Sequence, residues 1–222
     1  MPRKKFNLSL LPPAPDLTFE RSLWDAGIRV VAGIDEAGRG ALAGPVAAGV
    51  VVLPNRPNLV DLMDGVRDSK QMTAKTRQHW AQKIEDLSAA CQVGFADPDE
   101  VDDLGILPAT RLAAMRAIAR LPNIPEHLLI DYISIPGSGI SETSLIKGDR
   151  RCLSIAAASI LAKVRRDEYM LQMDEKYPNY GFASHKGYGT AKHLAAIKKF
   201  GPCPLHRMSF APMRPDNQPP LF

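Results

Sequence analysis

Runs of apolar residues divide the chain into alternating strands and helices. Two apolar runs rich in β-formers, Ile28–Ile34 and Val46–Leu53, flank a glycine-rich turn, so we expect two paired strands there. Shorter runs predict further strands at Gln92–Ala96 and Leu128–Ile133. Because helical patterns follow these strands and alternate with them, the sequence predicts an α/β fold with a mixed sheet.

Helical spacing of apolar residues predicts four helices. Thr73–Leu87 has the pattern of a capped amphipathic helix, and Pro108–Leu121 and Thr190–Phe200 predict two more. The longest pattern covers Cys152–Tyr177, and the residues at helical spacing within it are Ile155, Ser159, Ala162, Arg166 and Met170.

Prolines mark both ends of the chain. Ten of the 19 prolines lie in residues 1–15 and 202–220, where they disfavour regular helix or strand. We therefore expect a flexible N-terminus over residues 1–20, one folded domain over residues 21–212 and a flexible tail over residues 213–222.

The composition is that of a soluble globular protein. The 222 residues are 45% hydrophobic and 23% charged, which excludes disordered, fibrous and membrane classes. The three cysteines are far apart and form no Cys-x-x-Cys pair, so neither a disulfide framework nor a zinc site is indicated. No apolar run has the length of a membrane span, and we expect a cytoplasmic protein without a signal peptide.

Positive charge is concentrated in the C-terminal part of the chain. The formal net charge is only +4, but residues 176–215 hold seven Lys or Arg residues and no acid. The rest of the chain is therefore slightly negative. Such a segment is either a solvated basic surface, which its charge alone favours, or a footprint for a polyanion.

Two adjacent carboxylates, Asp35 and Glu36, end the first predicted strand. Carboxylates at the end of an apolar strand are costly to bury unless something positive is bound there. A divalent cation would supply that charge, and Mg²⁺ prefers oxygen ligands of this type. Asp131 ends another predicted strand and Asp149 precedes the longest helix, so both could join them.

Simpler interpretations of Asp131 and Asp149 stay open. Asp149 is placed to cap the following helix, and Asp131 could be a strand-end acid facing water. Five further acids between residues 97 and 103 follow no apolar strand, and we assign them to the solvated start of a helix.

The glycines after the first strand indicate close backbone approach to a ligand. Gly38, Gly40 and Gly44 are one residue too widely spaced for a dinucleotide-binding turn, and the two acids would repel a pyrophosphate. The glycines still leave backbone groups accessible, and Arg39 could contact a phosphate.

Two other segments could contact a polyanion. Lys70 precedes a predicted helix, where it is either a surface lysine or a phosphate contact. Lys186 and Tyr188 lie in a glycine-flanked loop within the basic segment. A tyrosine there either packs in the protein or stacks on a sugar or base.

Taken together, these segments resemble ribonuclease HII, the bacterial type 2 ribonuclease H, from about residue 28 to residue 213. The matching motifs, in chain order, are Gly33–Gly40 with Gly44–Val46, Asp68–Lys70, Lys147–Asp149 running into Ile155–Lys163, Arg166–Asp167, His185–Gly189, and His206–Arg207 with Ser209–Phe210.

The resemblance implies a ribonuclease H-like α/β fold, with a mixed five-stranded sheet flanked by helices and a helical C-terminal extension. Residues 21–212 would then be the catalytic domain. The resemblance further implies a metal-binding catalytic site for two Mn²⁺ or Mg²⁺ ions in the substrate complex, formed by Asp35, Glu36, Asp131 and Asp149.

The substrates implied are RNA–DNA hybrids and duplex DNA that contains ribonucleotides. Family members cut on the 5′ side of a ribonucleotide and leave 3′-hydroxyl and 5′-phosphate ends, in DNA repair and replication. Their substrate-binding residues correspond here to Gly38, Arg39, Gly40, Lys70, Lys186 and Tyr188. A monomer without membrane association is the family expectation.

Two features lie outside the common pattern. Tyr132 follows the third carboxylate, where the family commonly has glycine. At the C-terminus, Gln218, Leu221 and Phe222 resemble the short peptide with which bacterial replication proteins bind the sliding clamp, although an unstructured tail is the simpler interpretation of a single pentapeptide.

Two other functions remain as alternatives to an RNA–DNA hybrid nuclease. One is a catalytically silent nucleic-acid-binding protein with the same fold, against which the four carboxylates argue. The other is a different nuclease of the same superfamily, such as a resolvase-like enzyme, which would lack the Gly-Arg-Gly loop and Tyr188.

Overall fold

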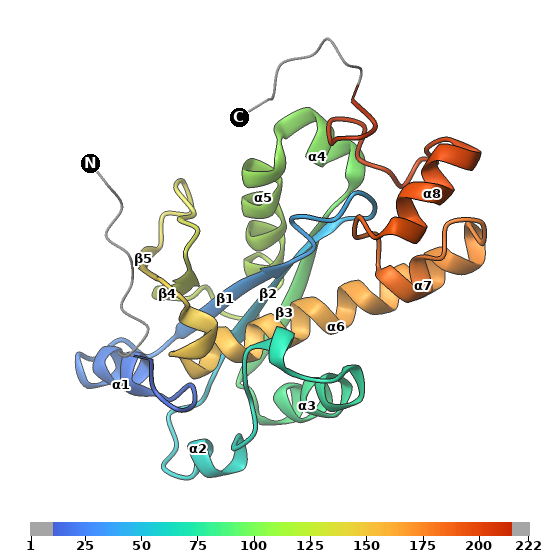
Figure 1. The fold of residues 1–222 in the computed structure, drawn as a ribbon. Coiled ribbons are helices and arrows are strands. Elements are labelled where there is room, and N and C mark those ends of the chain that lie inside the picture. The colour runs from blue at the N-terminus through green and yellow to red at the C-terminus, as the bar shows by residue number, and fades with distance from the viewer. Residues whose placement is uncertain (1–10, 215–222) are drawn as a thin grey trace.

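A mixed five-stranded sheet forms the centre of the computed structural model, which describes residues 11–214 (Figure 1). The strand order is β3-β2-β1-β4-β5. β2 pairs antiparallel with β1 and with β3, whereas β1, β4 and β5 run parallel. The strands are β1 (Val31–Ala37), β2 (Val46–Val52), β3 (Ala90–Ala96), β4 (His127–Asp131) and β5 (Ser141–Leu145).

Helices cover both faces of the sheet (Figure 1). α6 (Leu153–Lys176) and α3 (Ala74–Leu87) lie on one face, where they bury a cluster with β2. α5 (Ile106–Ile118) lies on the other face and packs on β2 and β3. The shorter elements are α1 (Thr18–Asp25), α2 (Leu59–Leu62), η2 (Ser69–Gln71), α4 (Pro98–Leu104) and η3 (Gly148–Arg150).

Glycines let α6 approach the sheet closely. A Cβ on Gly33 of β1 would lie 2.3 Å from the carbonyl carbon of Ser154, and a Cβ on Gly49 of β2 would lie 2.3 Å from the carbonyl oxygen of Ala158. Both distances are shorter than any real van der Waals contact. The backbone of α6 therefore rests directly on β1 and β2, which fixes where its N-terminus meets the edge of the sheet.

The C-terminal part adds α7 (Phe182–His185) and α8 (Ala191–Phe200) beside the end of α6 (Figure 1). Three buried histidines hold this part together. His193 donates from Nδ1 to the carbonyl of Tyr188 (3.0 Å), and its Nε2 lies 3.1 Å from Nε2 of His206. The His185 ring stacks on His193, with 4.3 Å between ring centroids.

The expected fold class is confirmed, and most expected elements are present with shifted ends. β1 begins three residues later than expected and continues through both acids to Ala37. α1 and β5 were not expected, and α1 crosses the boundary at residue 20 that we placed between a flexible N-terminus and the folded domain. Residues 1–10 and 215–222, including the C-terminal peptide, lie outside the described residues. Within residues 11–214, no helix has the length and apolar character needed to cross a membrane.

Candidate metal centre and substrate-binding surface

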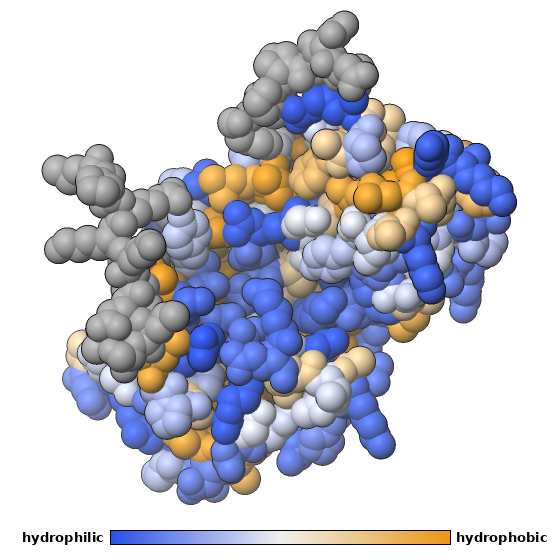
Figure 2. Space-filling view, in the orientation of Figure 1, coloured by the Kyte–Doolittle hydropathy of each residue, from blue (hydrophilic) through white to orange (hydrophobic). Residues whose placement is uncertain are grey.

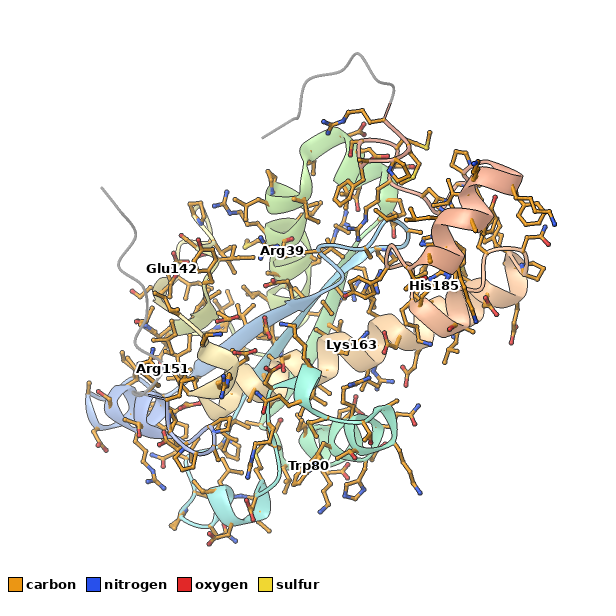
Figure 3. The ribbon with its side chains drawn as sticks, viewed as in Figure 1. Arg39, Trp80, Glu142, Arg151, Lys163 and His185 are labelled. Carbon is orange, nitrogen blue, oxygen red and sulfur yellow. The ribbon has the colours of Figure 1, made fainter. Side chains whose placement is uncertain are left out.

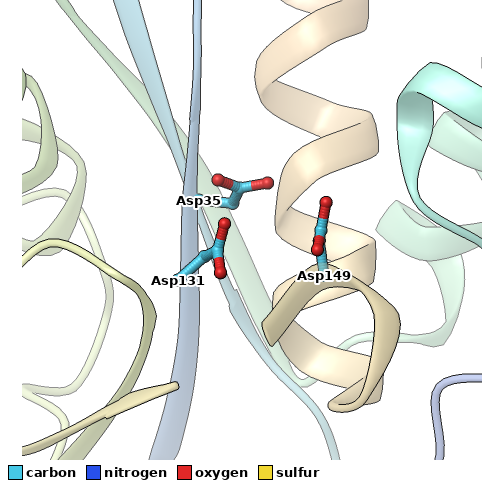
Figure 4. A group of neighbouring side chains, drawn as sticks. All are labelled: Asp35, Asp131 and Asp149. Atoms are coloured by element: carbon cyan, nitrogen blue, oxygen red, sulfur yellow. The ribbon is translucent and has the colours of Figure 1, made fainter. Parts of the chain in front are cut away.

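The parallel pairing of β1 and β4 brings two of the predicted acids together. Ile34 pairs with Ile130, so Asp35 follows on β1 where Asp131 follows on β4. Asp149 comes from η3, the turn that leads into α6. Figure 4 shows the three carboxylates pointing toward one another near the carboxyl ends of β1 and β4.

These three side chains form what we call the carboxylate cluster. One oxygen of each carboxylate lies within 4.8 Å of one oxygen of the other two. Asp35 and Asp149 are buried, at 5% and 6% exposure. Several carboxylate oxygens in so small a space are the ligands that hard divalent cations such as Mg²⁺ and Mn²⁺ prefer, so the donor set fits such an ion.

Burial and mutual repulsion raise the pKa values in the carboxylate cluster. The pKa of Asp35 lies well above its ordinary range because the side chain is buried and because Glu36 and Asp131 repel its charge. Burial, followed by repulsion from Asp131, raises the pKa of Asp149 to about 6. Three charged carboxylates are therefore costly to keep here without a cation.

Backbone N–H groups orient two of the three carboxylates. The N–H of Gly148 donates to Oδ1 of Asp131 at 2.7 Å, and the N–H of Glu36 donates to Oδ1 of Asp35 at 2.7 Å. A Cβ on Gly148 would lie 2.7 Å from Cδ1 of Ile155, so a larger residue there would require the end of the Ile155 side chain to shift. The turn that carries Asp149 is thereby tied to the end of β4.

Glu36, the fourth predicted carboxylate, lies apart from the other three. Successive side chains of a strand point to opposite faces, so Glu36 points away from Asp35. Its Oε1 accepts a hydrogen bond from Arg39 at 3.1 Å. Burial raises the pKa of Glu36 even though Arg39 opposes that shift, and repulsion by Asp131 adds to it. Glu36 is therefore close enough to the cluster to feel the charge of Asp131, but its carboxylate is paired with Arg39.

The loop after β4 accommodates Tyr132 in an unusual backbone conformation. Tyr132 has φ 64° and is 54% exposed. A positive φ is easily adopted by glycine and strained for tyrosine, which explains why glycine suits this position. Nearby, Glu142 of β5 accepts hydrogen bonds from Ser134 and from the N–H of Ile135, which holds the rest of the loop.

Lys70 lies within the electric field of the carboxylate cluster. It belongs to η2, which is tethered to α6 because the N–H of Ser69 donates to Oγ of Ser159 (3.4 Å). Burial alone would lower the pKa of Lys70, but the negative charges of Asp35 and Asp68 outweigh it and raise the pKa. Hydrophilic side chains gather across this face, over the start of α6 and the segment before α3 (Figure 2).

Lys186 and Tyr188 follow α7, and they lie beside α6. The Tyr188 ring is half-buried, with Nζ of Lys163 at 5.5 Å from its centroid. Lys186 has φ 52°, and its side chain donates to the carbonyl of Ala183. Lys163, His185 and Arg39 come from α6, α7 and the loop after β1, three segments that border the same region of the fold (Figure 3).

Two buried arginines in this region were not assigned a role from the sequence. Arg166 of α6 and Arg207 are both fully buried and donate to backbone carbonyls of the loop after β1. A signal for Arg166 was present, because it shares the apolar face of α6 with Ile155 and Met170. A charged side chain on such a face needs a buried partner. Arg207 lies in the His206–Arg207 motif, but no apolar periodicity around it indicates that it is buried.

The chain matches one protein family over most of its length. The family model for ribonuclease HII matches residues 32–213. A ribonuclease HII from Synechococcus sp. (strain JA-3-3Ab) is 48% identical over 200 residues, which cover 90% of both chains.

Solved structures agree with this match. Ribonuclease H2 from Pyrococcus horikoshii OT3 superposes with a TM-score of 0.70 at 26% identity, over 83% of this chain and 95% of that chain. The structure of the PCNA:RNase HII complex from Archaeoglobus fulgidus gives a TM-score of 0.68 at 25% identity, over 81% of this chain and 94% of the matched chain.

Proposed function

The chain belongs to the ribonuclease HII family, and on that premise we propose that the carboxylate cluster, with Glu36 beside it, is the catalytic metal centre of an endonuclease. The protein hydrolyses the RNA strand of RNA–DNA hybrids and cuts at ribonucleotides embedded in duplex DNA. The observation that carries the assignment of residues is the convergence of Asp35, Asp131 and Asp149 within 4.8 Å.

The cofactor we propose is Mg²⁺ or Mn²⁺, with two ions in the substrate complex. Glu36 would complete the ligand set for the second ion, together with the scissile phosphate. When bound, such ions activate a water for in-line attack and stabilise the leaving 3′ oxygen. The products are then a 3′-hydroxyl and a 5′-phosphate, with the cut on the 5′ side of the ribonucleotide.

The protein groups of the centre contribute orientation and charge. The N–H of Gly148 holds one oxygen of Asp131, which leaves its other oxygen for a cation. Arg39 neutralises Glu36 in the free protein, and an arriving cation would replace that ion pair and release the guanidinium toward a phosphate. The repulsion among the ionised carboxylates, which contributes to the raised pKa values of Asp35 and Asp149, would be relieved by a bound cation.

Substrate recognition is proposed for the loop after β1 and for the turn after α7. Discrimination of RNA from DNA at one nucleotide requires contact with the 2′-hydroxyl, and we assign it to the backbone of Gly38, Arg39 and Gly40, of which Gly40 is exposed. Tyr188 would pack on the following deoxyribose. Lys70 and Lys186 would hold phosphates through their own positive charge, and the raised pKa of Lys70 keeps that side chain protonated.

The cellular setting we propose is ribonucleotide removal in DNA repair and replication, by a cytoplasmic monomer. Free thiols at Cys91, Cys152 and Cys203 support a reducing compartment. The relative from Archaeoglobus fulgidus is seen in a complex with PCNA. We propose a similar sliding-clamp contact through Gln218, Leu221 and Phe222, to be tested by clamp pull-down of the chain with and without its last five residues.

One cleavage assay tests the proposed function. A DNA duplex with a single ribonucleotide is incubated with the protein and Mg²⁺ or Mn²⁺. We expect a cut 5′ to the ribonucleotide that falls by at least roughly 10³-fold in Asp35→Asn, because the substitution removes a ligand at the centre of the cluster.

Asp86→Asn is the matched control, since Asp86 is an exposed carboxylate on α3, and it should cleave like wild type. Tight binding of the duplex without cleavage would instead indicate a silent binding protein. Cleavage of an all-DNA branched duplex, with the ribonucleotide ignored, would indicate another nuclease of the superfamily.

A further inference from the structure

Arg166 and Arg207 are buried charges that lack an acidic partner. Both side chains have 0% exposure. Among residues 11–214, neither forms an ion pair with a carboxylate. Burial lowers the pKa of Arg207 to about 9, and the charge of Arg166 adds to that effect. Two uncompensated guanidinium groups at one place are costly, so the fold must gain something from them.

Backbone carbonyls take the place of the missing carboxylates. Arg166 donates from Nη2 to Ala43 (3.0 Å), from Nε to Pro45 (2.8 Å) and from Nη1 to Lys186 (2.9 Å). Arg207 donates from Nη1 to the carbonyl of Arg39 (2.9 Å) and from Nε to that of Gly44 (3.0 Å). Four of these carbonyls belong to the loop after β1, residues 38–45, which we call the β1–β2 loop.

Holding the carbonyl of Arg39 inward turns the next N–H outward. In a trans peptide the C=O of one residue and the N–H of the next point in opposite directions. The bond from Arg207 to the Arg39 carbonyl therefore directs the N–H of Gly40 away from the protein interior. Gly40 is exposed, and within the described part of the chain no acceptor is found for its N–H. That N–H is a donor presented to whatever lies on this surface.

The absent side chain of Gly38 makes room for this arrangement. Gly38 has φ 88°, and a Cβ there would lie 1.9 Å from Nε of Arg166. The guanidinium of Arg166 thus fills the space beneath the β1–β2 loop. Any larger residue at position 38 would displace Arg166 and, with it, the carbonyls that Arg166 holds.

Arg166 also joins the β1–β2 loop to the turn that carries Tyr188. Besides its bond to the carbonyl of Lys186, its Cζ lies 5.4 Å from the centroid of the Tyr188 ring. The carbonyl of Gly187 accepts from the N–H groups of Leu42 and Ala43, so the two segments are also joined directly. A displacement of either arginine would therefore alter both proposed recognition segments together.

We propose that Arg166 and Arg207 are positioning residues for ribonucleotide recognition, which fix the β1–β2 loop so that the Gly40 N–H faces the 2′-hydroxyl side of the substrate. The proposal rests on the proposed function, because it assigns that loop to substrate contact. Neither arginine touches substrate or the carboxylate cluster. Their effect is on which duplex is recognised, and not on metal binding or on the general attraction to DNA.

The test compares the binding of two duplexes of identical sequence, one with a single ribonucleotide and one all DNA, in Ca²⁺ or without metal. Arg166→Lys and Arg207→Lys keep the charge but lose the planar fork of donors, which spans three carbonyls in Arg166 and two in Arg207. We expect the preference for the ribonucleotide duplex to fall by about tenfold, the size of one lost hydrogen bond. Affinity for the all-DNA duplex and for Mn²⁺ should change less than twofold.

Arg165→Lys is the matched control, because Arg165 is the neighbouring arginine on α6 and pairs with Glu85 and Glu168 at the surface. It should keep the wild-type preference. As a second test, the duplex preference of Arg207→Ala is measured with and without added guanidinium. The added guanidinium should restore the preference if the missing donor is the cause of its loss.

Three outcomes are distinguishable. An unchanged preference in correctly folded Arg166→Lys and Arg207→Lys would overturn the proposal. A parallel loss of Mn²⁺ binding, all-DNA binding and thermal stability, without rescue by guanidinium, would overturn it too, since that result describes a merely structural role. No preference in the wild-type protein would refute the proposed substrate contact itself.

Discussion

Asp35 shows how a functional side chain lowers the stability of the fold that holds it. It is buried, it faces two other carboxylates, and its pKa is raised well above the ordinary range. A carboxyl group with a raised pKa in the folded state destabilises that state at pH values above the unfolded pKa, where the unfolded chain ionises more easily. When its carboxylates are ionised, the cluster therefore holds repulsion that protonation or a bound cation would remove.

Asp35→Asn should consequently stabilise the metal-free protein while abolishing cleavage. We expect Tm to rise by about 3 °C, which corresponds to roughly 1 kcal/mol for a chain of this size. Differential scanning fluorimetry without metal and with Mn²⁺ measures the effect, and the increase in Tm caused by Mn²⁺ should be smaller than in wild type. A lower Tm than that of Asp86→Asn in the absence of metal would contradict the prediction.

The buried imidazole of His193, in the C-terminal part, predicts that the stability of the fold depends on pH. Burial lowers the pKa of His193 to about 4, whereas an unfolded histidine titrates near ~6.5. Between those values the unfolded chain binds more protons, so this group makes stability fall as pH drops from about 6.5 toward 4. As pH drops over that range, the Tm of His193→Gln should fall by less than the Tm of the wild-type protein. His79→Gln, an exposed histidine on α3, is the control and should follow wild type.

At the scale of elements, the close contact of α6 with the sheet determines where the turn with Asp149, proposed as catalytic, lies. Gly33 and Gly49 have no side chain to separate the helix from β1 and β2. η3, with Asp149, is continuous with the start of α6. The position of Asp149 relative to Asp35 therefore depends on a helix–sheet distance that two glycines permit.

Gly49→Ala should separate α6 from β2 and reduce stability by about 2 kcal/mol or more, because the added Cβ meets the rigid backbone of Ala158 at 2.3 Å. Urea unfolding measures the loss, and Mn²⁺ affinity should fall with it. Gly137→Ala is the contrast: Gly137 has φ 88° but a Cβ there meets nothing within 4 Å, so only backbone strain of about 1 kcal/mol is expected. Equal losses in the two variants would argue against the close-contact explanation.

Elements with a strong apolar period could be predicted from the sequence, and those without one could not. α3 and α6 lie within a residue or so of their predicted bounds because buried side chains recur at helical spacing. β5 was not expected because its sequence, Ser-Glu-Thr-Ser-Leu, is polar, and as an edge strand it is stabilised by pairing with β4 rather than by burial. α1 follows a proline-rich stretch, and its one fully buried residue is Glu20.

Parts of the site could also be predicted from the sequence, and other parts could not. Asp35 was expected at the end of an apolar strand, and parallel pairing explains why Asp131 lies next to it. The ion pair between Glu36 and Arg39 was not expected, because it depends on the turn of the chain after β1. Arg207 was singled out as part of a motif, but its role could not be predicted, since the carbonyls it binds carry no mark in the sequence.

At the scale of the whole molecule, the proposed site draws on the full length of the described chain. Asp35 comes from the first strand, Asp149 from the middle and Tyr188 from the C-terminal part. The proposed site thus combines an acidic centre with residues of the basic C-terminal segment. The centre would take cations, and the segment would take the phosphates around them.

Salt dependence tests how much of the basic segment contacts nucleic acid. We expect Lys186→Ala to lower the slope of log Kd against log salt by about 1, as for one lost phosphate contact. Reversing Lys192, Lys198 and Lys199 on α8 to Glu should lower it further. Fluorescence anisotropy with a hybrid duplex, in the Asp35→Asn background to prevent cleavage, measures both. An unchanged slope in the triple variant would restrict the contact to the turn after α7.

The length of α6 limits where related sequences can carry insertions and deletions. Its N-terminus follows the turn with Asp149, and Arg166, thirteen residues beyond Leu153, supports the β1–β2 loop. At about 1.5 Å per residue these points lie roughly 20 Å apart, and one inserted residue would also rotate the second by about 100°. Insertions and deletions should therefore be absent between Leu153 and Arg166 in active relatives, whereas the loop at residues 136–139 should accept them freely.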